Sequence, residues 1–108
     1  MSKTPADPDS LVIEQLRAAG ADLDQATEVV VYLYFPSKDA AVAAAQQVRE
    51  MGFPGMRVSA SADDSWACIG SRQMVPELGT IRELSRGLER LANALGGEYD
   101  GWEAAVRQ

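Results

Sequence analysis

The segment that decides the fold is Glu28–Phe35, EVVVYLYF. Most of its residues are β-branched or aromatic, as is typical of a strand, and both of its faces are apolar, which favours a central position in a sheet. Side chains alternate between the two faces of a strand, so Tyr32 and Tyr34 are expected to share one face with Val30. The opposite face then carries Val29, Val31, Leu33 and Phe35.

A helix and a hairpin are predicted after this strand. Ser37 can cap a helix that has a small, alanine-rich stripe. Residues 56–61 and 65–72 are predicted to be two strands joined at Asp63 and Asp64, because a two-residue acidic turn suits a hairpin. The stripe of the helix consists of Ala41, Ala44, Ala45, Val48 and Met51.

A second helix and a last strand complete the pattern. Pro76 suits the first turn of a long helix, and Gly96 and Gly97 are placed to stop it. EYDGW, residues 98–102, is the candidate last strand. The apolar stripe of the long helix consists of Leu78, Ile81, Leu84, Leu88, Leu91 and Leu95.

One more helix precedes the first strand. Asp9 or Ser10 can cap it, and Gly20 can end it. Residues 1–8 contain two prolines and no apolar periodicity, so we expect a disordered lead-in there. Residues 9–108 have the usual size of a single domain.

The order of these elements predicts the fold class. After the N-terminal helix the pattern is strand–helix–strand repeated, the split β-α-β arrangement. Right-handed crossovers place the first and third strands in the centre and both helices on one face. We therefore predict an α+β fold, a ferredoxin-like four-stranded antiparallel sheet with two helices on one face and an additional N-terminal helix.

Composition excludes several classes of function. The chain of 108 residues has 10 basic and 16 acidic residues, a net charge of −6, which disfavours binding to a nucleic-acid backbone and suits a basic partner. It has no histidine, so it lacks the usual general base and zinc ligand. No stretch is long and apolar enough to span a bilayer, and we expect a cytoplasmic protein.

No catalytic or metal-binding pattern emerges. The serines have no histidine to activate them, and Cys68 in a strand is expected to be a small buried residue. Asp22 and Asp24 are more typical of a turn than of a metal site. We therefore predict a protein that is not an enzyme and that has no cofactor and no metal.

Aromatic and acidic residues are the candidates for function. Tyrosine and tryptophan are enriched at binding hot spots, although they also fill protein cores. If the last strand runs beside the first, Tyr99 or Trp102 would lie near the tyrosine pair. The first strand has no lysine or arginine, so protein binding is favoured over stacking of RNA bases. The predicted partner-binding residues are Tyr32, Tyr34, Glu98, Tyr99, Asp100 and Trp102.

The closing motif GGEYDGWE, residues 96–103, also resembles a known family. It is similar to the C-terminal signature of the regulators of ribonuclease E activity B (ribonuclease E inhibitor B, RraB), in a short form. The stretches AAGADLDQATEVVVYLYFPSKDAAVAAA and GLERLANALGGEYDGWE resemble the family's first strand with its flanking segments and its final helix and strand.

This resemblance implies a ferredoxin-like fold and a non-catalytic cytoplasmic regulator. Such a protein would modulate RNA turnover by binding an endoribonuclease of the ribonuclease E type at its noncatalytic C-terminal region. The chain stops at Gln108 without the strongly acidic tail of the long members. Alternatives are an immunity or adaptor module with another partner, or a small-ligand sensor, since similar sheets support both.

Overall fold

The computed structural model describes residues 8–106. The predicted disordered lead-in therefore lies outside the described residues, apart from Pro8, where the first helix begins. The elements are α1 (Pro8–Ala18), β1 (Thr27–Phe35), α2 (Lys38–Glu50), β2 (Arg57–Ala60), β3 (Trp66–Met74), α3 (Leu78–Ala94) and β4 (Glu98–Ala104).

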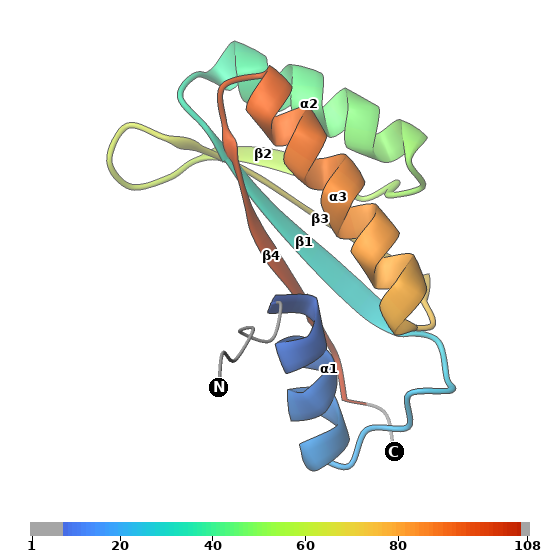
Figure 1. Ribbon diagram of the computed structural model, residues 1–108. Coiled ribbons are helices and arrows are strands. Elements are labelled where there is room, and N and C mark those ends of the chain that lie inside the picture. The colour runs from blue at the N-terminus through green and yellow to red at the C-terminus, as the bar shows by residue number, and fades with distance from the viewer. Residues whose placement is uncertain (1–7, 107–108) are drawn as a thin grey trace, which may run out of the picture.

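The four strands form one antiparallel sheet in the order β2-β3-β1-β4. The fold is α+β, and the predicted central placement of the first and third strands is confirmed. Helices α2 and α3 lie side by side on one face of the sheet, and α1 lies at one end of it beside β4 (Figure 1). The two-residue acidic turn is also confirmed, since Asp63 and Asp64 have φ angles of 59° and 60°.

Helix starts follow the capping chemistry. Ser37 caps α2 as predicted, with its hydroxyl accepting a hydrogen bond from the Ala40 N–H at 3.1 Å. The predicted start of α3 at Pro76 is wrong. Glu77 is extended and its carboxylate accepts from the N–H groups of Gly79 and Thr80, so this side chain caps the helix and the first helical residue is Leu78.

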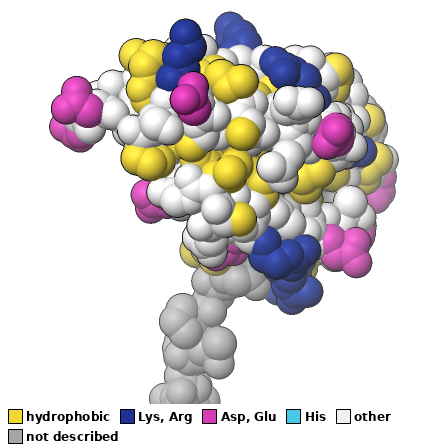
Figure 2. Space-filling view, turned by 90° about the horizontal axis from the view of Figure 1, so that it is seen from above, with side chains coloured by type: hydrophobic (Ala, Val, Ile, Leu, Met, Phe, Trp, Pro, Cys, Tyr) yellow, Lys and Arg dark blue, Asp and Glu magenta, His cyan; other side chains and the backbone are white. Residues whose placement is uncertain are grey.

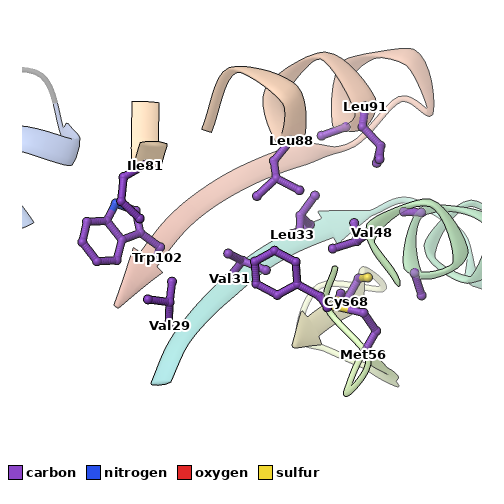
Figure 3. Close-up of a cluster of buried hydrophobic side chains, with 14 of the residues drawn as sticks. Val29, Val31, Leu33, Val48, Met56, Cys68, Ile81, Leu88, Leu91 and Trp102 are labelled. Atoms are coloured by element: carbon purple, nitrogen blue, oxygen red, sulfur yellow. The ribbon is translucent and has the colours of Figure 1, made fainter. Parts of the chain in front are cut away.

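The core lies between the sheet and the two long helices. The four alternating apolar residues of β1 are 0–1% exposed, so their predicted face is confirmed. They meet Val48 of α2 and the stripe of α3 that contains Ile81 and Leu88 (Figure 3). The small alanines Ala41 and Ala44 are fully buried, which lets α2 sit close to the sheet. One face of the sheet is thereby covered, and this separates the candidate site residues into two groups.

Candidate functional site

A β-bulge in β4 decides where the closing motif points. Tyr32 lies opposite Gly101, but the next residue of β1, Leu33, lies opposite Tyr99. Asp100 is therefore an extra residue in β4, as in a β-bulge. Gly101 has a φ of 107°, a conformation that glycine adopts without the steric cost of a Cβ.

Because of the bulge, both aromatic residues of the motif lie on the helix side of the sheet. Tyr99 lies opposite Leu33 and Trp102 lies opposite Val31, and both partners belong to the buried face of β1. The expectation that Tyr99 or Trp102 would lie near the two tyrosines of β1 is wrong. In a regular strand, Tyr99 and Trp102 would lie on opposite faces, because they are three positions apart. The extra residue Asp100 brings them to the same face.

Trp102 belongs to the core and is tied to the N-terminal helix. It is 6% exposed and lies near Ile81 and Val29 (Figure 3). Its Nε1–H donates to Asp9 Oδ1 at 2.9 Å, and the Ser85 hydroxyl donates to the same oxygen at 2.9 Å. This network joins β4, α1 and α3 through a single carboxylate.

Tyr99 extends the same network. Its hydroxyl lies 3.2 Å from the Ser85 hydroxyl. Burial raises the pKa of Tyr99 to about 12; the Ser85 hydrogen bond opposes this shift, and the negative charges of Asp9 and Glu89 add to it. The phenol therefore stays neutral at physiological pH and acts as a hydrogen-bonding group.

Sequence reasoning missed Asp9 and Ser85 as partners of the motif. Asp9 was considered only as a helix cap. Ser85 is a polar residue one turn after Ile81 on the buried face of α3, and a buried hydroxyl requires a partner, so this signal was available. Asp100, by contrast, is exposed, and its side chain makes no hydrogen bond within residues 8–106.

The two tyrosines of β1 lie on the opposite, open face of the sheet. Tyr32 and Tyr34 are half-buried, with Ile69 and Ala67 of β3 directly opposite them. None of the described helices packs on this face (Figure 1). Tyr32 donates a hydrogen bond to the carboxylate of Glu103, and this bond is the main cause that raises the pKa of Tyr32 to about 12. The open face therefore presents the neutral phenol of Tyr32 beside the carboxylate of Glu103.

An open hollow of about 400 Å³ adjoins Tyr34 at one end of the sheet. The end of β1, the start of β4 and the β2–β3 loop meet there, which brings Glu98 together with Asp63 and Asp64. In Figure 2, acidic side chains project at the left edge, where the β2–β3 loop lies in Figure 1. Three of the six predicted partner-binding residues thus share one surface, namely Tyr32, Tyr34 and Glu98.

Metal-ligating side chains, long apolar helices and the single thiol each bear on the kind of site. Within residues 8–106, no three histidine, cysteine, aspartate or glutamate residues are grouped so that they could hold a metal ion. In the same range, no helix is long and apolar enough to cross a membrane. Cys68 is fully buried, and burial raises the pKa of its thiol to about 11, which disfavours the nucleophilic thiolate.

Comparison with known families identifies the chain. The model of the family described as regulator of ribonuclease activity B, RraB, matches residues 6–104. The chain belongs to the RraB family. The match covers α1 through β4, so the family resemblance predicted from the closing motif is confirmed. No curated protein matches the chain.

In this RraB-family chain the closing motif has two structural parts. Tyr99 and Trp102 point inward and connect β4 to α3 and α1. Glu98 lies opposite Tyr34 on the open face, and Glu103 reaches Tyr32 on the same face. A motif of eight residues thus secures the last strand and contributes carboxylates to the open face.

Proposed function

We propose that this RraB-family protein is a non-catalytic regulator that acts by binding a ribonuclease through the open face of its sheet. Membership in a family of regulators of ribonuclease activity supports the function. The choice of this surface rests on one observation, namely that Tyr32 and Tyr34 lie on a sheet face without a covering helix.

The chemistry of this face favours a basic protein segment. Tyrosines combine a large apolar area with a polar tip, and they are frequent anchors in interfaces. Glu98, Asp63 and Asp64 lie beside Tyr34 at one end of the face. Glu98 and Glu103 of β4 are on this face, and Arg57 of β2 is on the same face at the opposite edge. Carboxylates around an aromatic centre speed the encounter with a positively charged partner and help to set its register.

The same proposal includes the fold family, the identity of the partner and the roles of individual residues. We assign the domain to the ferredoxin-like folds, which the strand order supports. The partner is an endoribonuclease of the ribonuclease E type, bound at its noncatalytic C-terminal region in the cytoplasm. In this proposal Tyr32, Tyr34 and Glu98 contact the partner directly, and Tyr99 and Trp102 hold β4 in place.

A binding experiment with matched variants tests the surface. Tyr34→Ala is expected to weaken binding of the ribonuclease E C-terminal region by about 30-fold, the equivalent of a hot spot of roughly 2 kcal/mol. The control is Val42→Ala, because Val42 is 47% exposed on α2, on the covered side of the sheet. Calorimetry gives the affinities, and circular dichroism verifies folding. Equal binding by folded Tyr34→Ala and Val42→Ala proteins would exclude this face.

The proposal that the protein has no catalytic activity is tested separately. Highly purified protein is incubated with labelled RNA, with and without divalent metal, and no cleavage is expected. RNA cleavage that disappears on substitution of one acidic residue would contradict the proposal and would reveal a catalytic carboxylate.

A further inference from the structure

One half of the open sheet face carries large side chains, and the other half is hollow. Tyr32 and Tyr34 project from β1, and the Tyr32 hydroxyl is held towards β4 by its bond to Glu103. Over β2 and β3 there is a hollow of about 440 Å³. Strand alternation places three of its lining residues on the open face, namely Arg57, Ser59 and Ile69.

The charges on this face are also divided between its two edges. Glu98 and Glu103 are on β4, at one edge, and Arg57 is on β2, at the opposite edge. Neither Arg57 nor Glu98 makes an ion pair or a side-chain hydrogen bond within residues 8–106. The two edge strands are three strand spacings apart, roughly 14 Å, so these charges do not pair within one sheet.

A twofold axis makes this face complementary to itself. The axis runs along the strands, above the boundary between β3 and β1. It places β2 of one copy over β4 of a second copy, and β1 of one copy over β3 of the second. The tyrosines of each copy then lie over β3 of the other copy, beside its hollow.

The register of the strands brings the charges together in this arrangement. Pairing across the sheet places Arg57 at the level of Gly101 in β4. Glu98 and Glu103 are on either side of this level, and Gly101 has no side chain to fill the position between them. An arginine of a second copy therefore meets two carboxylates, with which a guanidinium forms paired hydrogen bonds.

The charges also select this axis over another one. A twofold axis across the strands would place β4 over β4, and the carboxylates of the two copies would then face each other. Like charges opposed in an interface cost several kcal/mol, so that arrangement is disfavoured.

The size of the face indicates a reversible dimer. With four strands side by side and seven residues in β4, the face measures roughly 19 by 23 Å, or about 450 Å² per copy. Stable complexes commonly bury about 800 Å² per partner, so this interface is at the small end of specific contacts.

We propose that a second copy of this chain packs on the open face through this twofold arrangement. Each copy places its tyrosines beside the hollow of the other and its Arg57 between the carboxylates of the other. The proposed ribonuclease contact uses the same face, so dimer and complex exclude each other, and self-association limits the protein available for binding. This exclusion rests on the proposed function, whereas the dimer itself is tested without any ribonuclease.

The test measures self-association of the full chain by sedimentation, from micromolar to millimolar concentration. We expect a monomer–dimer equilibrium. Arg57→Glu and Glu98→Arg should each weaken the dimer by about tenfold or more, because each variant opposes like charges at both symmetric contacts. Both residues are exposed, so the variants should fold, which circular dichroism verifies. The matched control is Arg90→Glu, since Arg90 is exposed on α3, on the covered side of the sheet (Figure 1).

A mixture of the two variants tests the geometry directly. In a mixed dimer of Arg57→Glu with Glu98→Arg, one contact keeps its original arginine and glutamate, and the other has the two charges exchanged. Both contacts are then attractive, so the mixture should associate more tightly than either variant alone.

Three results would overturn the proposal of a dimer. These are the absence of self-association over this range, equal weakening by Arg57→Glu and Arg90→Glu, or no gain in association on mixing. The exclusion is tested by adding the ribonuclease E C-terminal region, which should dissociate the dimer. A complex that retains two paired copies of the chain would contradict the exclusion. Failure of that region to bind the monomeric Arg57→Glu protein would count against the proposed function, while the dimer would stand.

Discussion

Removing the Asp9 carboxylate is the most informative perturbation of this molecule. Asp9 Oδ1 accepts the only hydrogen bond that the indole N–H of Trp102 donates within residues 8–106, and the Trp102 side chain is 6% exposed. Ser85 also donates to this oxygen, but its hydroxyl can turn towards Tyr99, which lies 3.2 Å away. The main cost of Asp9→Ala is therefore the unpaired indole N–H.

The expected magnitude follows from these contacts. A buried donor left without a partner costs about 1–3 kcal/mol, so we expect Asp9→Ala to lower the free energy of unfolding by about 2–3 kcal/mol. In a domain of this size, each kcal/mol of lost unfolding free energy lowers Tm by about 4–8 °C, so Tm should fall by roughly 10 °C or more. Because total stabilities are commonly about 5–15 kcal/mol, the variant should still fold.

Urea unfolding followed by circular dichroism measures the effect, and Asp100→Ala is the matched control. Asp100 is exposed and makes no hydrogen bond within residues 8–106, so its removal should cost less than about 0.5 kcal/mol. A double-mutant cycle with Trp102→Phe, which removes the indole donor, should give a coupling of about 1–2 kcal/mol. Equal losses for Asp9→Ala and Asp100→Ala, or a coupling near zero, would refute the reasoning.

Three further outcomes are expected. Gly97→Ala should destabilise the domain by about 2 kcal/mol or more in a thermal melt, because the new Cβ would lie 2.3 Å from Phe35 Cδ1, whereas Gly55→Ala meets no atom within 4 Å and should be neutral; equal melts would contradict this packing. The Cys68 thiol should resist a thiol reagent in the native state and react after denaturation, since it is fully buried; rapid native reaction would be inconsistent with that burial. The raised pKa of Tyr99 means that its neutral form is favoured in the folded state, so this contribution to stability is present below pH 10 and lost as the pH rises towards 12. Tyr99→Phe should flatten the fall of stability in that range, and an unchanged alkaline profile would argue against this assignment.

Much of the architecture could be predicted because it depends on local patterns. The alternation in Glu28–Phe35 identified a central strand and its buried face, and both are present. Ser37 and the acidic pair Asp63-Asp64 marked a helix start and a turn, since caps and turns depend on residues a few positions apart. The start of α3 was misplaced because Glu77, outside the usual set of capping residues, supplies the acceptor.

The candidate site was predicted only in part. Tyr32 and Tyr34 do share the open face, as strand alternation predicted, whereas Glu98 joins them only because the β-bulge shifts the register of β4. Tyr34 and the acidic turn line the same hollow because of the loops that meet at one end of the sheet, and the sequence pattern does not specify that meeting. Here the local rules were adequate for the faces of β1 but not for the faces of β4 or for the loops that meet beside Tyr34.

The sequence by itself determined the order of the elements, the apolar face of each and the family of the chain. Only the tertiary structure decided that Tyr99 and Trp102 point inward, because an extra residue in a strand is defined by the pairing with its neighbour. It also decided that Asp9, at one end of the chain, holds Trp102 at the other. Residues 93 positions apart meet only when α1 docks beside α3 and β4, and no local pattern records such a contact.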